Sequence, residues 1–298
     1  MSARLVWETD GRDWPNRSHS RFVQAAGLDW HVQQFGDSSL PSSAPTVLLI
    51  HGTGSSSHSW RDVAPLLAKR YRVLSIDLPG HGFTAMPEPA EQSLTSMSRK
   101  LGALLKALSF SPQVVVGHSA GAAIGARLAL DKAIAPFALI SLNGAFVGFG
   151  GLAGQLFSPI ARLLAAGSFA SRFFAWQAQD PAVVEKLMRS TGSVLDTTGM
   201  RLYAQLVRNP GHVSGALAMM AHWDLVPLEH ELPSLNIPVW LVAAENDLTV
   251  PPAQASLVAR RLQKPRIVLW PMLGHLAHEE SPAQCAALVD EVVSATAK

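Results

Sequence analysis

The chain has 298 residues, of which 48% are hydrophobic and 15% are charged, and its formal net charge is +2. A chain of this length and composition can bury a full core, which favours a globular protein and excludes intrinsic disorder. Lysine and arginine are scattered instead of forming a basic stripe, which argues against a nucleic-acid partner. The single cysteine, Cys285, excludes an internal disulfide, and we interpret it as a buried core thiol.

The N-terminus and one long uncharged stretch bear on localisation. Charged residues between positions 8 and 13 interrupt the N-terminus before an apolar stretch forms, so no secretory signal is expected. Residues 133–161 carry no charge, but glycines and prolines divide them into pieces too short to span a bilayer. We therefore expect a cytoplasmic protein without a transmembrane segment. Peripheral contact with a membrane stays open.

Apolar runs bounded by turn residues predict eight strands. After a polar arm at residues 1–20, the runs 21–25 and 28–35 flank the turn Ala26-Gly27 and are typical of an antiparallel pair. Six further apolar runs are typical of buried parallel strands: residues 46–50, 71–76, 114–116, 137–142, 239–243 and 267–270. Helical periodicity lies between and after them, for example at residues 94–108 and 282–293. We predict an α/β fold with a mostly parallel eight-stranded sheet flanked by helices.

A candidate nucleophile follows the third of these parallel runs. The apolar run 114–116 continues as Gly117-His118-Ser119-Ala120-Gly121 and then as a helical pattern of small residues. This order is typical of a strand, a sharp elbow that lifts the Ser119 hydroxyl out of the sheet, and a helix. Side chains at Gly117 or Gly121 are expected to collide with neighbouring backbone. The helix N-terminus beneath Ser119 favours a developing negative charge.

A flexible loop after residues 46–50 is a candidate for stabilising that charge. It reads His51-Gly52-Thr53-Gly54-Ser55-Ser56-Ser57 and can turn a backbone N–H inward. The N–H groups of Thr53 and Ala120 then form a two-donor oxyanion hole, with Gly54 as the second choice. The alternative is an ordinary glycine and serine turn. It is not a phosphate loop, because no Lys-Ser or Lys-Thr follows at the required spacing.

The remaining catalytic partners are expected at two later strand ends. Asp247 comes just after residues 239–243 and His275 just after residues 267–270, so both lie along the same edge of the sheet as Ser119. A serine hydroxyl needs an imidazole to accept its proton, and the imidazole needs a carboxylate to orient it. Glu245 is the alternative acid and His278 the alternative base. No further ligand pattern accompanies His275 and His278, so neither a metal nor a cofactor is expected.

About ninety residues separate the strand at 137–142 from the strand at 239–243, and this interval is rich in aromatic residues and methionine. Its length argues against a structureless loop and predicts a helical cap at residues 146–236. The α/β core then comprises residues 1–145, including the arm, and residues 237–298. Most cap side chains are expected to form the cap's own core. The candidates for lining a substrate pocket are His51, Phe146, Phe149, Phe174, Trp176, Met219 and Trp223.

From about Arg21 onward, the chain resembles the α/β-hydrolase superfamily, whose catalytic residues follow the order serine, acid, histidine. A narrower resemblance, to the magnesium-chelatase accessory hydrolases of bacteriochlorophyll biosynthesis, rests on four motifs. These are Asp10-Gly11-Arg12-Asp13-Trp14-Pro15, Trp30-His31-Val32-Gln33-Gln34, His51-Gly52-Thr53-Gly54 and Asp77-Leu78-Pro79-Gly80-His81-Gly82-Phe83-Thr84. The first motif carries the narrower resemblance, since the others recur across hydrolases. It implies a role around magnesium insertion into protoporphyrin and a functional link to magnesium chelatase, without supplying a reaction.

Three functions are therefore considered. The leading hypothesis is a serine hydrolase, most simply a carboxylic-ester hydrolase, that acts on an ester or thioester of an apolar substrate in or beside tetrapyrrole metabolism. The second is a porphyrin-binding accessory protein with a vestigial triad. The third is a generic carboxylesterase or carbon–carbon bond hydrolase with no link to pigments. The cap is compatible with a flat apolar tetrapyrrole, but apolar contacts discriminate weakly among substrates.

Overall fold

The computed structural model describes residues 4–36, 40–41, 43–148 and 168–296. Its centre is an eight-stranded sheet with the strand order β1-β2-β4-β3-β5-β6-β7-β8. The strands are β1 Ser20–Ala25, β2 Leu28–Phe35, β3 Thr46–Ile50, β4 Arg72–Ile76, β5 Val114–His118, β6 Ala138–Leu142, β7 Val239–Ala244 and β8 Pro265–Trp270. The pairings of β1 with β2 and of β2 with β4 are antiparallel, and those from β4 to β8 are parallel. The predicted fold class is confirmed.

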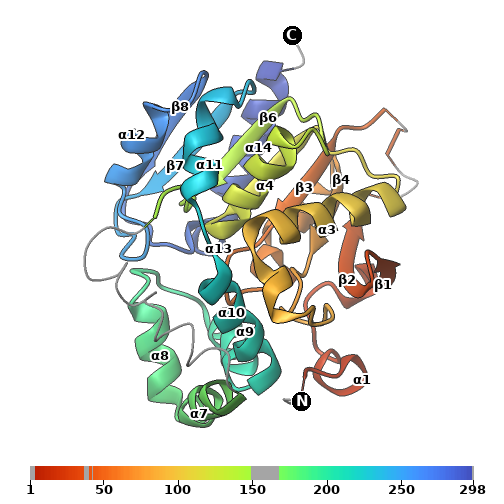
Figure 1. Cartoon of the computed structure of the whole chain (residues 1–298), viewed down its shortest axis with the longest axis vertical. Coiled ribbons are helices and arrows are strands. Elements are labelled where there is room, and N and C mark those ends of the chain that lie inside the picture. Colours follow the sequence, from red (N-terminus) through yellow and green to blue (C-terminus); the bar gives the residue numbers. More distant parts are fainter. Residues whose placement is uncertain (1–3, 37–39, 42, 149–167, 297–298) are drawn as a thin grey trace.

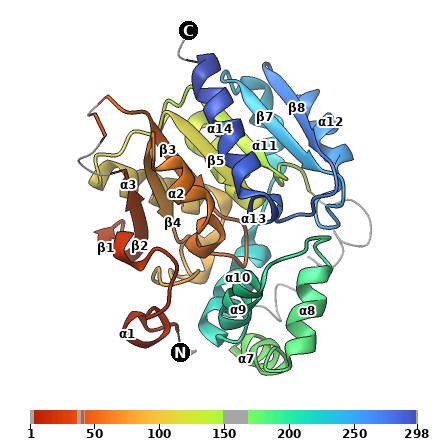
Figure 2. The ribbon, with the colours of Figure 1, turned by 180° about the vertical axis from the view of Figure 1, so that it is seen from behind.

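Helices cover both faces of the sheet (Figures 1 and 2). On one face lie α3 Leu94–Ala107, α4 Ala120–Leu130 and α11 Val226–Glu231, and on the other lie α2 Val63–Leu67 and α14 Pro282–Thr296. β3 is buried from end to end because Leu48 and Ile50 belong to the first core cluster and Val47 and Leu49 to the second. The same alternation in the neighbouring strands fixes the sheet between two apolar layers.

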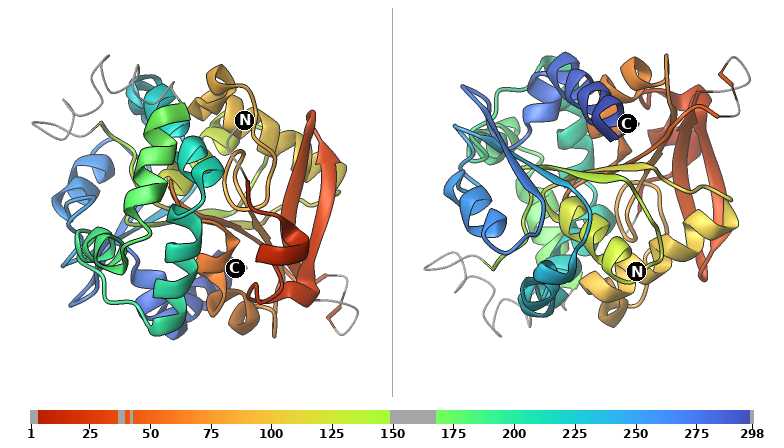
Figure 3. Two further views of the ribbon diagram at one scale, coloured as in Figure 1. Left: turned by 90° about the horizontal axis from the view of Figure 1, so that it is seen from below. Right: turned by 90° about the horizontal axis from the view of Figure 1, so that it is seen from above.

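Four helices lie beyond one end of the sheet, below it in Figure 1 and in front of it in the left view of Figure 3. They are α7 Ser168–Gln177, α8 Pro181–Arg189, α9 Thr197–Val207 and α10 Pro210–His222, and we call them the cap helices. All four come from the interval between β6 and β7. By contrast, α11 comes from the same interval but packs against α4, with Leu228 in the first core cluster. The cap boundaries at 146 and 236 stay a prediction.

The remaining short elements connect these layers. They are α1 Trp7–Asp10, η1 Arg17–His19, η2 Ser57–Trp60, η3 Pro89–Gln92, η4 Leu232–Ser234, α12 Ala253–Ala259 and α13 Ala277–Glu280. The N-terminal arm reaches the cap, since Trp14 packs with Phe83 and with Leu202 and Leu206 of α9. The arm therefore ties the loop after β4 to a cap helix.

The cysteine and the helices bear on two expectations from composition. Cys285 is buried, and burial raises the pKa of its thiol to about 12, as expected for an inert core cysteine. Within the described ranges, none of the helices combines the length and the apolar character that crossing a bilayer requires.

Candidate active site

Ser119 sits in a strained turn between β5 and α4. Its φ of +51° and ψ of −119° are unusual for a residue with a side chain. Backbone bonds hold it there: its N–H donates to Leu142 O at 3.0 Å, and its carbonyl accepts from Ala122 N and Ala145 N, both at 3.1 Å. The strained conformation is thus held by hydrogen bonds to α4, to the end of β6 and to the segment after β6.

The glycines around Ser119 have the steric role that their positions predict. A Cβ on Gly117 would lie 2.5 Å from Ala122 N, and a Cβ on Gly121 would overlap the carbonyl oxygen of Ile50. Gly52 is equally constrained from the opposite side, because its Cβ would lie 2.9 Å from the Cβ of Ser119. The loop after β3 therefore approaches Ser119 so closely that only glycine fits at position 52.

Asp247 and His275 meet at the ends of β7 and β8. His275 Nδ1–H donates to Asp247 Oδ2 at 2.8 Å, and both side chains are buried. The second carboxylate oxygen, Oδ1, accepts the N–H of Thr249 at 2.7 Å and of Val250 at 2.8 Å. Because Nδ1 carries the proton in this pair, Nε2 is the nitrogen that can accept one.

The alternative acid and base are not part of this pair. The Glu245 side chain is exposed on the bend after β7. The His278 ring is fully buried against Trp60 and His118, and within the described structure neither of its nitrogens has a hydrogen-bond partner. Burial lowers the pKa of His278 to about 3.

The backbone of His275 is held by residues that sequence reasoning missed or assigned otherwise. Its carbonyl accepts from His118 Nε2–H and from Asn143 Nδ2, both at 2.9 Å. Asn143 Oδ1 also accepts the N–H of Ala244 at 2.8 Å, so one side chain joins the ends of β6, β7 and β8. The only sequence signal for Asn143 is a polar residue directly after an apolar strand.

A carbonyl from the loop between α8 and α9 completes this arrangement. Thr191 O accepts the N–H of His275 at 3.1 Å and of Leu248 at 3.3 Å. Leu248 is the residue after Asp247. The loops that carry the acid and the histidine therefore share one acceptor from the segment inserted between β6 and β7.

The loop at residues 52–57 is built from small residues with defined partners, and we call it the oxyanion loop after the role that the sequence predicts for it. Gly54 has a φ of +75°, and an internal hydrogen bond runs from Ser55 N to Gly52 O at 3.2 Å. His51, just before it, donates from Nδ1 to Gly52 O at 2.7 Å and accepts at Nε2 from Leu78 N at 2.9 Å. His51 is fully buried, and both of its nitrogens are bonded to backbone groups.

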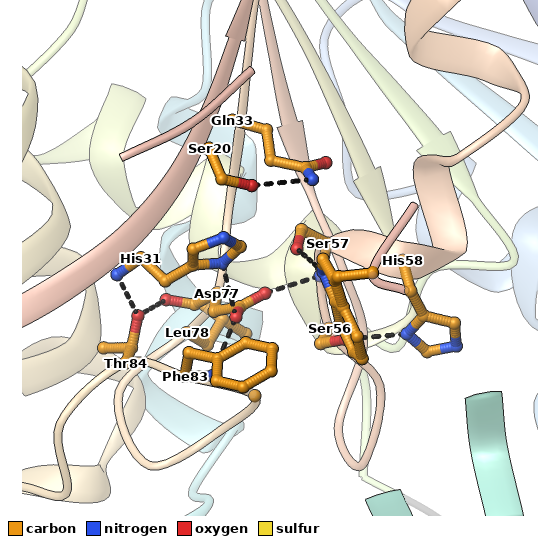
Figure 4. A network of polar contacts seen from close by, with 12 residues as sticks. Ser20, His31, Gln33, Ser56, Ser57, His58, Asp77, Leu78, Phe83 and Thr84 are labelled. Atoms are coloured by element: carbon orange, nitrogen blue, oxygen red, sulfur yellow. Dashed lines mark hydrogen bonds and ion pairs between the residues drawn. The ribbon is translucent and has the colours of Figure 1, made fainter. Parts of the chain in front are cut away.

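A buried carboxylate holds the far end of this loop (Figure 4). Asp77 accepts from Ser57 N at 2.6 Å, from His31 Nδ1 at 2.8 Å and from Phe83 N at 2.9 Å. Burial alone would raise the pKa of Asp77, but the His31 ring and the Phe83 amide outweigh it and hold the pKa well below its usual range. Asp77 therefore joins β2, the oxyanion loop and the loop after β4 as a structural anion.

A second buried carboxylate, Glu279, links the same loop to the cap. Its partners are Arg61, through a charge-assisted hydrogen bond, and the hydroxyl of Tyr203 on α9 at 2.7 Å. That hydroxyl also lies 3.1 Å from Ser55 Oγ. Burial raises the pKa of Glu279 to about 7 against the opposing effects of Arg61 and Tyr203. No sequence pattern pointed to this network.

Apart from His51, described above, the predicted pocket residues fall into three groups. Phe146 and Met219 are buried in the first core cluster, with Trp223 packed against it, and the sulfur of Met219 lies 3.4 Å from Thr53 Oγ1. Phe174 and Trp176 lie on α7 and are 50% and 69% exposed, so their place in a pocket stays a prediction. Phe149 lies outside the described residues. In the described part of the chain, no three His, Cys, Asp or Glu side chains are arranged to hold a metal ion.

Comparison with known proteins places this geometry in context. A model of the alpha/beta hydrolase family matches residues 47–288. The chain is 38% identical over 267 residues to the magnesium-chelatase 30 kDa subunit of Rhodobacter capsulatus, a match that covers 90% of this chain and 92% of that protein.

Solved structures agree on the fold. An alpha/beta hydrolase fold protein from Burkholderia ambifaria superposes with a TM-score of 0.73 at 26% identity, covering 91% of this chain and 99% of that one. The enol-lactonase from Burkholderia xenovorans LB400 has a TM-score of 0.75 at 19% identity, covering 92% and 100% of the two chains, which is a likeness of fold.

Proposed function

Because the chain belongs to the α/β-hydrolase family, we propose that it is a serine hydrolase that cleaves an ester or thioester bond, most simply as a carboxylic-ester hydrolase. Ser119 is the nucleophile, His275 the general base and Asp247 the carboxylate that orients it. The observation that carries this proposal is the buried 2.8 Å hydrogen bond from His275 Nδ1 to Asp247 Oδ2, at the ends of β7 and β8 of the same sheet in which β5 leads into the strained Ser119.

The proposed reaction has two halves. Ser119 Oγ attacks the substrate carbonyl as its proton passes to His275 Nε2, and the oxyanion is stabilised by the N–H groups of Thr53 and Ala120. His275 then gives that proton to the leaving alcohol or thiol, which leaves an acyl group on Ser119. A water molecule, deprotonated by His275, releases the acid and restores the serine. Asp247 keeps the imidazole in the required tautomer and stabilises its cationic form.

For the substrate class we propose an apolar molecule in or beside tetrapyrrole metabolism, around the magnesium-chelatase step. The support is the name of the Rhodobacter capsulatus relative, a magnesium-chelatase subunit. The interval between β6 and β7 is rich in aromatic residues and methionine, which suit an apolar ligand. That name also favours a second candidate, a porphyrin-binding accessory protein in which the triad is unused.

Labelling of the serine tests the chemistry. We expect a fluorophosphonate to modify wild-type protein at Ser119, and we expect Ser119→Ala to fold normally while losing both labelling and hydrolysis of p-nitrophenyl acetate. His275→Ala should be comparably inactive, whereas His278→Ala should keep most activity. Wild-type turnover by Ser119→Ala would overturn the serine mechanism.

Fluorescence titration separates the two candidates. Saturable quenching by protoporphyrin or its magnesium form below about 50 micromolar supports a pigment ligand. Binding without labelling or turnover favours the accessory role. Turnover without binding leaves a carboxylesterase, or a hydrolase of carbon–carbon bonds, with no link to pigments.

A further inference from the structure

Each of three successive residues in the oxyanion loop is contacted by a side chain from the cap helices. Met219 of α10 meets Thr53, and Tyr203 of α9 meets Ser55. Between them, His212 of α10 bonds the backbone carbonyl of Gly54 at 3.0 Å. Of the three, only His212 bonds the backbone of the loop, so it acts on the chain conformation itself.

The two ring nitrogens of His212 have opposite roles. Nδ1 accepts the N–H of Gly82 at 3.1 Å, and Nε2–H donates to the carbonyl of Gly54 at 3.0 Å. An amide N–H only donates and a carbonyl only accepts, so these partners fix the tautomer with its proton on Nε2. The ring is 3% exposed, and burial lowers its pKa to about 4, so it is neutral at physiological pH.

The backbone of His212 is also fixed. Its N–H is capped by Asn209 Oδ1 at 2.9 Å, at the start of a helix that runs from Pro210 to His222. The ring therefore projects from the rigid first turn of α10. Because the side chain is held in this way, the position of the cap helix determines the position of the Gly54 carbonyl that the ring bonds.

The bonded carbonyl belongs to a glycine, in a part of the loop whose backbone has unusual conformational freedom. Glycine occupies positions 52 and 54, and the φ of +75° at Gly54 is a conformation that glycine adopts without strain and can also leave easily. Fixing the Gly54 carbonyl also fixes the Ser55 N–H of the same peptide, which donates to the Gly52 carbonyl at 3.2 Å. The Gly52 carbonyl in turn shares its peptide with the Thr53 N–H. An oxyanion donor is effective only when it is oriented before the charge develops.

We propose that His212 is a positioning residue for the oxyanion hole: its Nε2–H holds the Gly54 carbonyl and thereby orients the Thr53 N–H, which couples the hole to cap helix α10. This inference rests on the serine-hydrolase function proposed above. It follows that displacement of α10 loosens the hole, so acyl transfer is fastest when the cap helix is seated.

A pair of amide substitutions separates the two ring nitrogens. In His212→Gln the side-chain amide nitrogen reaches the place of Nε2 and can donate to Gly54, whereas in His212→Asn the side-chain oxygen takes the place of Nδ1 and can accept from Gly82. We measure kcat and KM for p-nitrophenyl acetate and the inhibition constant of phenylboronic acid, which forms a tetrahedral adduct with an active-site serine. Thermal unfolding monitors the fold.

We expect His212→Ala and His212→Asn to lose about 10- to 100-fold in kcat with KM changed less than about twofold. The boronic acid should bind more weakly by a similar factor. His212→Gln should recover kcat to within about fivefold of wild type. If His212→Ala does not fold, the Gln and Asn variants still decide the question.

Three results would overturn the inference while leaving the proposed function standing. They are a wild-type kcat in His212→Asn, recovery by Asn in place of Gln, or a loss in His212→Gln equal to that in His212→Asn. Failure of wild-type protein to react with a fluorophosphonate or to hydrolyse the ester has a different meaning, because it refutes the serine-hydrolase proposal itself.

Discussion

At the scale of single residues, both carboxylate oxygens of Asp247 have defined hydrogen-bond partners. One accepts from His275 and the other from the amides of Thr249 and Val250. The amides fix the rotation of the carboxylate, so the remaining oxygen can meet only the imidazole. In the proposed mechanism this carboxylate specifies which nitrogen of His275 carries the proton.

Asp247→Asn therefore tests the tautomer. The asparagine oxygen can keep the two backbone amides while its NH₂ group donates to His275 Nδ1, which places the imidazole proton on Nε2, where it cannot accept from Ser119. We expect a fall in kcat of about a thousandfold or more, equivalent to about 4 kcal/mol, with little change in thermal stability. Glu245→Gln is the matched control and should keep wild-type activity. A loss below about tenfold in Asp247→Asn would show that another group orients the histidine.

At the scale of elements, a residue's role could be predicted from the sequence when the pattern that indicates it lies within a few neighbouring residues. Ser119 was recognisable as a candidate nucleophile because the elbow needs two glycines within five residues. Asp247 and His275 were recognisable as its candidate partners because each follows a strand of a parallel sheet. His212, Glu279 and Asn143 were not, since their partners lie more than fifty residues away and their roles exist only after packing. Which face of α7 is exposed could not be predicted for the same reason, because composition does not specify which side of a helix is buried.

The contact between α10 and the loop after β4 gives a prediction at this scale. A Cβ on Gly215 would overlap the carbonyl oxygen of Gly80 and lie 2.7 Å from its carbonyl carbon. Alanine normally stabilises a helix interior by about 1 kcal/mol relative to glycine. Here we expect Gly215→Ala to lower the free energy of unfolding by about 1–3 kcal/mol, because α10 must move away from the loop.

Urea unfolding of a matched pair checks this expectation. Gly102 also lies within a helix, α3, but the nearest atom to a Cβ there is Ala133 Cβ at 3.3 Å, so a shift of a few tenths of an ångström suffices. Gly102→Ala should leave stability unchanged or slightly raised. Equal stability of the two variants would mean that α10 is not held tightly against Gly80.

At the scale of the whole molecule, buried imidazoles dominate the response to acid. Burial lowers the pKa of six of the described histidines, to about 4 for His212 and about 3 for His278. The six are His51, His58, His81, His118, His212 and His278. Unfolded, each takes up a proton near its ordinary value of 6.5, whereas the folded protein does not until lower pH. Their contribution to stability is therefore complete above about pH 6.5 and is lost as the pH falls below it.

We expect the free energy of unfolding to fall steeply between about pH 6.5 and 4.5, by up to about 1.4 kcal/mol per pH unit for each such histidine. Glu279 acts in the opposite sense. Its raised pKa, about 7, makes the folded state bind a proton that the unfolded state has released, so its contribution to stability is lost as the pH rises from about 4.5 to about 7. The opposing contribution of Glu279 to the pH dependence of stability is smaller than the summed contribution of the six histidines.

His278→Phe is the informative variant for this prediction. It keeps an aromatic ring against Trp60 and removes one titrating group. The slope of unfolding free energy against pH should become shallower by up to about 1.4 kcal/mol per unit. A stability that stays level between pH 7 and 5 in the wild type would contradict the expected role of the buried histidines.

The carbonyl of Thr191 has a consequence for protein engineering. New specificities are sought by grafting the insertion of one hydrolase onto the sheet of another, with crossovers placed at the strand ends. In this chain such a chimera would discard the acceptor shared by Leu248 N and His275 N. Such an exchange therefore has to keep the turn around Thr191 with the sheet that receives the insertion. The insertion then consists of a part that can be transferred and a part that supports the loops of Asp247 and His275.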